Sequence, residues 1–312
     1  SKREKTLVDY YYVNYPQVFD GEEHEGYYTQ EQIKDVVAYA ASKYINVVPE
    51  IEMPGHALAA LASYPELSFD STQTYKVSPT WGVFEQVFCP SETTFKFFEG
   101  VMDEVVELFP SEYIHIGGDE CPKTAWKNSA FCQQLIRQLG LKDDVTPSKV
   151  DGVKHSKEDK LQSYFVTRME KYLNDKGRNI IGWDEILEGG LAPNATVMSW
   201  RGVEGGLNAA KAGHNAIMTP MPYAYLDFYQ EDPAIAPTTI GGYTTLKKTY
   251  SYNPAPDDAD ELVKKHVIGM QGNIWREYMK NSDRTDYQAF PRAMAIAETG
   301  WTLDANIMAG RD

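Results

Sequence analysis

The sequence predicts an α/β protein built around a parallel sheet. Short apolar segments alternate with segments of helical periodicity along most of the 312 residues. The apolar segments do not alternate polar with apolar residues, so we expect them to be buried on both faces, with the helices as crossover connections. Hydrophobic residues make up 42% of the chain and charged residues 24%, as is usual for a globular protein that buries a large core.

About six strands and six main helices are predicted. The helices begin or end at ordinary signals, such as Ser91 as an N-cap and Gly177 or Gly213 after the last turn. Ile33, Val36 and Val37 begin an apolar face on the first helix. The predicted strands cover residues 46–51, 113–116, 179–183, 196–200, 215–219 and 267–275, and the helices cover 31–45, 93–109, 161–177, 203–213, 258–266 and 290–301.

The chain shows no internal repeat, low-complexity tract or polar linker, so residues 1–312 are predicted to form a single domain. The stretch from about Pro220 to Pro256 is rich in Tyr, Pro and Gly and lacks a helical period. A connection of this length is uncommon in a compact domain unless it has a function. We therefore expect it to be a functional loop.

Acids and large aromatic residues follow every predicted strand, whereas the helix-to-strand connections carry ordinary turn residues. In a (β/α) barrel the catalytic groups lie on the loops after the strands. The pattern therefore predicts a (β/α) barrel with its site on that face. The residues concerned are Glu50, Glu52, His56, Asp119, Glu120, Trp183, Asp184, Glu185, Trp200, Arg201, Tyr225, Asp227, Trp275, Arg276 and Glu277.

Composition excludes several other classes of function. A net charge of −15 argues against general binding to nucleic acid or to anionic membranes. No apolar run is long enough for a membrane span, and the first residues lack a signal-peptide core. Three cysteines leave at least one unpaired, so a disulfide framework is not expected and the compartment is not indicated.

Acids surrounded by tryptophan and tyrosine suit a sugar ligand. The flat C–H faces of a pyranose stack on aromatic rings, and carboxylates accept hydrogen bonds from its hydroxyls. Glycoside hydrolysis needs a carboxylic acid that protonates the leaving oxygen and a second group that stabilises the oxocarbenium-like centre.

Seven segments in order, IHIGGDE among them, resemble glycoside hydrolase family 20, the β-N-acetylhexosaminidases. The others are VVPEIEMPGH, GWDEIL, VMSWRG, YLDFYQ, GNIWRE and AETGW, and the resemblance runs from about residue 27 to near the end. It implies a (β/α)8 TIM barrel and an exo-acting hydrolase that removes terminal β-linked GlcNAc or GalNAc. It also implies a retaining mechanism in which the substrate's own acetamide is the nucleophile.

The resemblance assigns five catalytic residues. Glu120 matches the general acid/base, and Asp119 matches the residue that orients and polarises the 2-acetamido N–H. Tyr225 matches the hydroxyl that holds the acetamido oxygen. His56 matches a relay to Glu120, with Glu52 orienting its imidazole. We expect Gly117 and Gly118 to relax the backbone so that both acids face one sugar, because neighbouring residues of an extended chain point to opposite sides.

Five further residues match substrate-binding positions. Trp183, Trp200 and Trp275 resemble the walls of the acetamide pocket and the sugar platform. Asp227 and Glu277 resemble the acceptors for the outer hydroxyls of the terminal sugar. Arg276 has the alternative role of a structural ion pair with Glu277.

We expect neither a metal nor another cofactor. His115 and Asp119 lie close in sequence, but no third histidine lies near them, and His115 on a strand is expected to pack in the core. Oligomeric state is not indicated. The resemblance points to a secreted, periplasmic or lysosomal location and to a glycan with a terminal N-acetylhexosamine as the partner.

Two alternatives stay open at this level. The chain could be a non-catalytic glycan-binding relic of the fold, although such a relic would have no reason to retain Asp119, Glu120 and Tyr225. It could also be a retaining glycosidase of the two-carboxylate kind, with Asp184 or Glu185 as nucleophile.

The family pattern also predicts an incomplete barrel. The first strand of the family, which bears an arginine for the sugar hydroxyls, and the second, which ends in a Trp-rich motif, have no match here. We therefore expect six of the eight strands, two open sheet edges, weak activity and poor solution behaviour for residues 1–312 alone.

Overall fold

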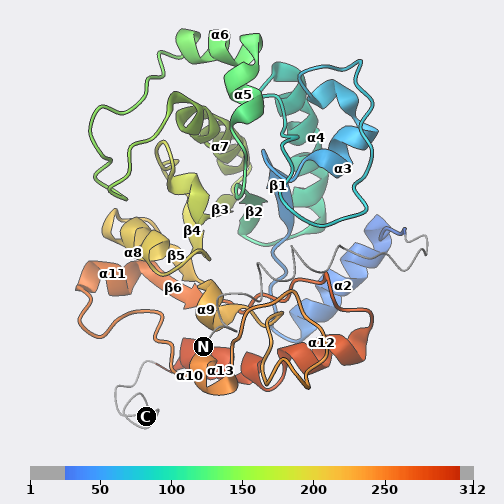
Figure 1. The fold of residues 1–312 in the computed structure, drawn as a ribbon, viewed down its shortest axis with the longest axis vertical. Coiled ribbons are helices and arrows are strands. Elements are labelled where there is room, and N and C mark those ends of the chain that lie inside the picture. Colours follow the sequence, from blue (N-terminus) through green and yellow to red (C-terminus); the bar gives the residue numbers. More distant parts are fainter. Residues whose placement is uncertain (1–24, 303–312) are drawn as a thin grey trace. The chain divides into compact units, whose positions relative to one another are not determined.

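A computed structural model describes residues 25–302 of the chain. Six strands form one sheet in the order β1-β2-β3-β4-β5-β6 (Figure 1). The pairs β1–β2, β2–β3 and β5–β6 are parallel. Because each strand lies next to its neighbour in sequence, the strand order never reverses, unlike that of a doubly wound sheet. The predicted α/β fold, with six strands of a (β/α)8 barrel, is confirmed.

The strands are short; those from β2 to β5 are mostly buried, whereas β1 has one buried residue and β6 has none. Their bounds are β1 Glu50–Met53, β2 Tyr113–Gly117, β3 Asn179–Trp183, β4 Thr196–Ser199, β5 Ala216–Met218 and β6 Val267–Met270. The predicted first strand began four residues too early. Pro49 has no N–H to give to a sheet, and regular pairing starts at the following residue.

The described residues group into two compact units. Unit 2 comprises residues 25–197 of the described part, and unit 1 comprises residues 198–302. The two units are described separately below. The prediction of a single domain stays a prediction.

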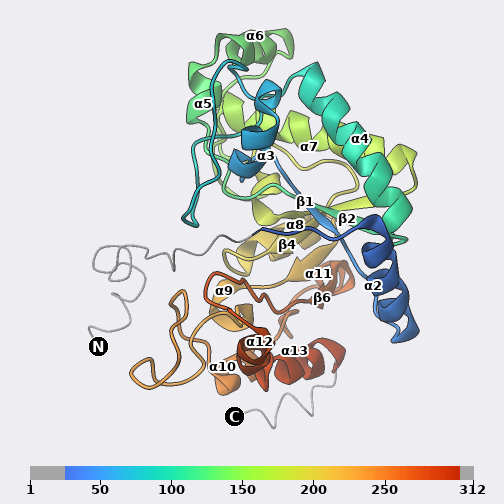
Figure 2. The same cartoon turned by 90° about the vertical axis from the view of Figure 1, so that its right-hand side faces the viewer.

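In unit 2 Ser91 caps α4, as predicted. Ser156 forms a capping box at α7, which begins four residues before the predicted start. Phe95 of α4 packs on Phe165 of α7 with ring centroids 4.8 Å apart, and the two helices lie side by side in both views (Figures 1 and 2). The helices are α2 Gln30–Ser42, α3 Leu58–Ser63, η1 Pro65–Leu67, α4 Glu92–Leu108, α5 Thr124–Asn128, α6 Ala130–Gln138, α7 Lys157–Asp175 and η2 Asp184–Leu187.

Unit 1 holds shorter helices around β5 and β6. The stretch from Pro220 to Pro256, predicted to lack helices, contains α9 and α10. Each is too short to show a helical period in sequence, which explains the error. The helices are α8 Glu204–Lys211, α9 Met221–Ala224, α10 Leu246–Tyr250, α11 Glu261–His266, α12 Ser282–Ala289 and α13 Arg292–Trp301.

Helix α2 forms as predicted, with a capping box at Thr29, but none of its residues is buried. Val36 is 54% exposed and Tyr39 67% exposed. The periodicity therefore identified the helix correctly, although within the described residues Ile33 and Val37 are only half-buried and Val36 is exposed.

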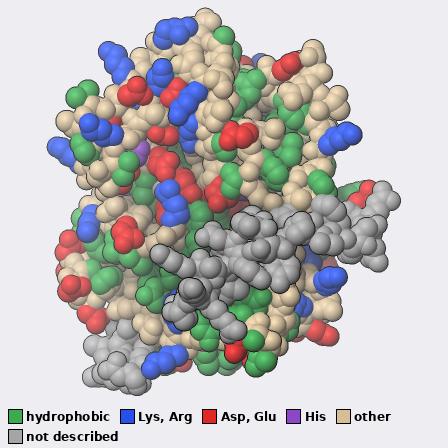
Figure 3. Space-filling view, in the orientation of Figure 1, with side chains coloured by type: hydrophobic (Ala, Val, Ile, Leu, Met, Phe, Trp, Pro, Cys, Tyr) green, Lys and Arg blue, Asp and Glu red, His purple; other side chains and the backbone are tan. Residues whose placement is uncertain are grey.

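The described surface carries charged side chains of both signs, as the composition of the chain implies. On the face drawn in Figure 3, acidic side chains are interspersed with Lys and Arg, and a group of acids gathers beside hydrophobic side chains. Among the described residues, no helix has both the length and the apolar character needed to cross a bilayer.

Candidate active site

The end of β1 delivers three polar side chains in unit 2. Glu50 and Glu52 are two residues apart on a strand and therefore point to the same side. The turn through Pro54 and Gly55 then positions His56. The φ of His56 is 45°, in the left-handed region that residues other than glycine seldom adopt. A Cβ on Gly55 would lie 2.8 Å from the backbone oxygen of Asp119, so this turn packs directly on the turn after β2.

The turn after β2 is built from left-handed residues. Gly117 has φ 70°, Gly118 has φ 96° and Glu120 has φ 45°. A Cβ on Gly117 would lie 1.9 Å from Glu52 Oε1, so glycine is required for space as well as for backbone conformation. These dihedrals turn Asp119 and Glu120 to the same side, as we expected of the glycine pair.

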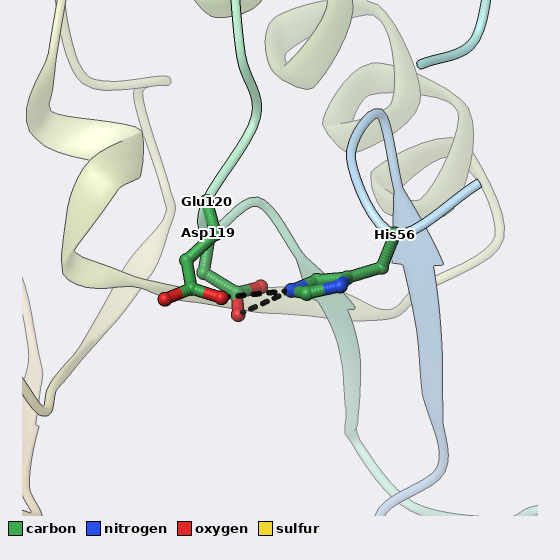
Figure 4. A group of neighbouring side chains, drawn as sticks. All are labelled: His56, Asp119 and Glu120. Atoms are coloured by element: carbon green, nitrogen blue, oxygen red, sulfur yellow. Dashed lines mark ion pairs between the residues drawn. The ribbon is translucent and has the colours of Figure 1, made fainter. Parts of the chain in front are cut away.

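The two acids meet at one imidazole, as Figure 4 shows. His56 Nε2 lies 3.4 Å from Asp119 Oδ2 and 3.3 Å from Glu120 Oε2. Hydrogen bonds to Asp119 and Glu120 raise the pKa of His56 to about 10, so the ring is an imidazolium at neutral pH. Asp119 Oδ1 is buried and has no hydrogen-bond partner within residues 25–302.

The side chain of Glu52 stabilises the turn that carries Asp119 and Glu120. Its Oε1 accepts a hydrogen bond from the Gly118 N–H at 3.1 Å. Burial, followed by the charges of Asp119 and Glu50, raises the pKa of Glu52, which favours the protonated form. The resemblance assigned Glu52 to orienting the imidazole of His56. In the structure Glu52 accepts a hydrogen bond from the Gly118 N–H, and its charge acts on His56 through space.

Sequence reasoning gave Glu50 no role, but its contacts give it one. Its Oε1 accepts a hydrogen bond from the Trp183 indole N–H at 2.8 Å and lies 3.4 Å from His115 Nδ1. Burial raises the pKa of Glu50 to about 6. The available signal was its spacing of two residues from Glu52, which places both acids on one side of β1.

His115 is a core residue, as predicted. It is 3% exposed, and its ring lies 4.9 Å from that of Trp183. Burial lowers the pKa of His115 to about 3, and its Nδ1 accepts a hydrogen bond from the Gly117 N–H. These contacts indicate that the His115 ring is neutral and helps to shape the turn after β2.

The carboxylates considered as alternative nucleophiles lie in η2, directly after β3. Asp184 is 2% exposed and Glu185 is 7% exposed. Both are therefore far less open to a substrate than Glu120, whose side chain is 36% exposed.

Unit 1 holds the other predicted residues. Tyr225 is buried, and its ring stacks on that of Trp200 at a centroid distance of 6.3 Å. The segment is fixed by the Leu226 N–H, which donates to the Asn273 carbonyl at 2.7 Å, and by a parallel bridge between Tyr225 and Asn273.

A pocket of unit 1 gathers three predicted substrate-binding residues, Asp227, Trp275 and Glu277. Asp227 is 4% exposed, and burial raises its pKa to about 7. Arg284 and Gln288 of α12 also line this pocket, and sequence reasoning missed both. Their helix lies outside the seven motifs, so spacing alone offered no signal.

Sequence reasoning also missed Arg292. It is fully buried and donates to the carbonyls of Leu226, Thr244 and Gln288 at 2.5, 2.8 and 2.7 Å. It thereby ties the segment that carries Asp227 to α12. A cation at the first position of a helix is unfavourable to the helix dipole, and this was the signal that Arg292 has another task.

The family model for the glycosyl hydrolase family 20 catalytic domain matches residues 2–304. The chain belongs to glycosyl hydrolase family 20. It is 50% identical over 285 residues to a β-hexosaminidase of Porphyromonas gingivalis, covering 91% of this chain and 35% of that protein. A β-hexosaminidase of Vibrio furnissii is 36% identical, over 92% of this chain and 45% of that protein.

Solved structures of the family agree. A β-N-acetylhexosaminidase crystal structure superposes with a TM-score of 0.78 at 31% identity, covering 94% of this chain and 61% of that one. An exo-β-N-acetylglucosaminidase of Vibrio harveyi, in complex with N-acetylglucosamine, gives 0.77 at 32% identity, over 95% and 46%. The chain thus spans about a third to a half of the curated relatives above.

One group of possible metal ligands is found within the described part of this family 20 chain. It is formed by His56, Asp119 and Glu120, with one donor atom from each lying within 4.8 Å of the others. A metal requires the neutral imidazole, whereas these carboxylates stabilise the imidazolium. The donor chemistry therefore fits a shared proton better than a metal ion.

Proposed function

We propose that this chain supplies catalytic residues of an exo-acting β-N-acetylhexosaminidase. The enzyme would remove terminal β-linked GlcNAc or GalNAc with retention of configuration and with the substrate's acetamide as nucleophile. The proposal is supported by membership of family 20 and by the two β-hexosaminidases to which the chain is similar. It extends to this chain the activity for which those longer proteins are named.

The observation that carries the proposal is the arrangement of Asp119 and Glu120 around His56. Both carboxylates contact the same imidazole, yet Asp119 keeps one buried oxygen without a partner in the described structure. A buried acceptor left unpaired costs about 1–3 kcal/mol, so a ligand N–H that pairs with it binds favourably. The acetamido N–H of an N-acetylhexosamine is such a donor.

In the proposed reaction Glu120 protonates the glycosidic oxygen as the bond to the anomeric carbon breaks. Asp119 accepts the acetamido N–H and so increases the charge on the acetamido oxygen, which attacks the anomeric carbon and forms an oxazolinium ring. Glu120 then removes a proton from the water that opens this ring. The imidazolium of His56 stabilises both carboxylates between these steps.

The other predicted residues take binding roles in this proposal. The hydroxyl of Tyr225 would hold the acetamido oxygen, and Trp183, Trp200 and Trp275 would contact the acetamide and the sugar face. Asp227 and Glu277 would accept hydrogen bonds from outer hydroxyls of the terminal sugar, which restricts cleavage to chain ends.

Paired chromogenic substrates test the proposal. We expect hydrolysis of an aryl β-N-acetylglucosaminide and almost none of the matching β-glucoside, which lacks the acetamide. A thiazoline analogue of the cyclic intermediate should inhibit strongly, and Tyr225→Phe and Asp119→Asn should each impair turnover of the N-acetyl substrate. Equal turnover of both glycosides would contradict an acetamide nucleophile.

The same assay separates the alternatives. A two-carboxylate enzyme would form a covalent glycosyl adduct on Asp184 or Glu185, detectable by mass spectrometry of the trapped protein. A glycan-binding relic would bind N-acetylglucosamine but hydrolyse neither glycoside. A chelator should leave turnover unchanged, because no step in the proposal uses a metal.

A further inference from the structure

Three residues that line the pocket of unit 1 carry buried polar atoms without a partner in the described part of the chain. Asp227 Oδ1, Arg284 Nη1 and Gln288 Oε1 are all buried and have no hydrogen-bond partner among the residues described. Asp227 is 4% exposed and Gln288 is 1% exposed. Unpaired buried groups are uncommon and costly, so three of them on residues that line one pocket indicate a ligand with complementary groups.

Arg284 and Gln288 are held firmly at one end. They are four residues apart on α12 and therefore lie on the same face of the helix. Arg284 Nη2 donates to the carbonyls of Pro237 and Thr238 at 3.0 and 2.9 Å. Gln288 Nε2 donates to the Asp227 carbonyl at 2.9 Å, so its amide orientation is fixed and the remaining group is an acceptor.

The polar groups that line the pocket define the chemistry of the ligand. Asp227, Glu277 and Gln288 offer acceptors, and Arg284 offers a donor. A hydroxyl group both donates and accepts, so two neighbouring hydroxyls on one ring can satisfy such a set. An anionic group would instead meet two acidic side chains. Trp275, which is 38% exposed, adds an aromatic face for the C–H side of a sugar.

We propose that Arg284 and Gln288 are specificity-determining residues that read the outer hydroxyls of the bound sugar. Arg284 donates from Nη1 to a hydroxyl oxygen, and Gln288 Oε1 accepts from a hydroxyl on the same ring. The identity of that sugar as an N-acetylhexosamine rests on the proposed function. The hydroxyl-reading role rests on this pocket alone.

The test combines variants with deoxygenated ligands. The dissociation constant is measured by calorimetry for the parent protein and for Arg284→Met, with N-acetylglucosamine and its 3-, 4- and 6-deoxy analogues. Arg284→Met should weaken binding of the complete sugar about 10- to 100-fold, the scale of a hydrogen bond to a charged group. It should add little further loss for the one analogue that lacks the contacted hydroxyl. Gln288→Met should show the same pattern with a smaller loss.

Arg137→Met is the matched control, because Arg137 is exposed on α6 of unit 2; it should leave all four constants unchanged. Arg284→Lys serves if the methionine variant unfolds, since it keeps a charge but loses the fork of two donors. It should weaken the complete sugar and again spare one analogue. Equal losses for every ligand would overturn the proposal and leave Arg284 as a support of residues 237–238.

Glucose and galactose complete the ligand panel. If the parent protein binds these sugars but not N-acetylglucosamine, the proposed function fails, and the coupling to Arg284 is then measured with deoxy forms of the sugar that binds. If it binds none of the sugars, the hydroxyl-reading role itself is wrong.

Discussion

In unit 2 two acids contact one shared imidazole, whereas in unit 1 the acids line a pocket. His56 lies within 3.4 Å of both Asp119 and Glu120, and Glu52 accepts a hydrogen bond from the neighbouring Gly118 N–H. Asp227, Arg284 and Gln288 instead keep buried atoms that nothing in the described structure satisfies. In the proposals above, the first arrangement serves proton transfer and the second serves ligand recognition.

The two regions also differ in backbone conformation. The acid–histidine cluster of unit 2 needs left-handed residues at His56, Gly117, Gly118 and Glu120. Such strain persists only where the surrounding structure fixes it, and it is common at sites of chemistry. The pocket of unit 1 is positioned by the buried guanidinium of Arg292 and by a helix face. The comparison predicts that unit 2 substitutions change the reaction step, whereas those in unit 1 change binding.

The largest expected effect is that of Glu120→Gln. Loss of general acid catalysis should lower kcat about 10²–10⁴-fold for substrates with poor leaving groups, with little change in binding. Substrates with very good leaving groups should lose less at the first step, because they need little protonation. Steady-state kinetics on both substrate types checks this, with Asp227→Asn as the contrasting variant that should raise KM more than it lowers kcat. Near-parental rates of Glu120→Gln on both substrates would remove Glu120 from this role.

The second effect tests the glycine turn through a matched pair. Gly117 and Gly177 have φ values of 70° and 72°, but a Cβ would meet Glu52 at 1.9 Å in the first and nothing within 4 Å in the second. Gly177→Ala should cost about 1–2 kcal/mol of unfolding free energy for the backbone alone. Gly117→Ala should cost about 2–5 kcal/mol, because it also displaces Glu52 from the Gly118 N–H. Chemical denaturation gives both values, and equal losses would show that the Glu52 contact adds nothing.

The third prediction separates the two regions by pH. The pKa of Asp227 rises from 3.8 to about 7 on folding, and that of His56 rises from 6.5 to about 10. In each window the folded protein holds a proton that the unfolded chain has lost, so stability falls as the pH rises through it. Asp227→Asn should abolish the part of the decline between about pH 4 and 7, and His56→Gln the part between about pH 6.5 and 10.

Unfolding free energies measured at intervals from pH 4 to pH 10 check both windows. Asp227→Asn should therefore gain most relative to the parent above pH 7, where the parent must bury a charge. His56→Gln should lose most below pH 6.5, where the parent has its ion pairs. A parallel shift of either variant at every pH would mean that the titrating group lies elsewhere.

The smallest effect concerns Glu50. Glu50→Met removes the acceptor of the Trp183 indole N–H, and a hydrogen bond of this kind contributes about 0.5–1.5 kcal/mol. We expect a change in the NMR signal of that indole, assigned through Trp183→Phe, and a modest rise in KM. Glu50→Gln keeps an acceptor and should preserve both. An unchanged indole signal in Glu50→Met would show that the contact does not order the tryptophan.

Much of this protein follows from its sequence, because local patterns encode local structure. Apolar runs and helical periods predicted the six strands and the main helices, and Ser91 marked the start of α4 as observed. The acids that follow the strands were recognised as candidate site residues because the ends of parallel strands lie together at one edge of the sheet. The family motif and the glycine pair predicted that Asp119 and Glu120 serve one ligand, and this stays a prediction; the structure shows that both acids contact His56.

What required the tertiary structure is everything set by contacts distant in sequence. Glu52 acts on Asp119, Glu50 anchors a tryptophan 133 positions away, and Gln288 bonds to the backbone of a residue 61 positions away. The same side chains elsewhere would be ordinary surface or core residues, because a pKa shift or an unsatisfied oxygen depends on burial and on neighbours that no local pattern specifies. Residue types and their order fixed which groups are available, and packing decided which of them contact a shared imidazole and which keep unpaired buried atoms.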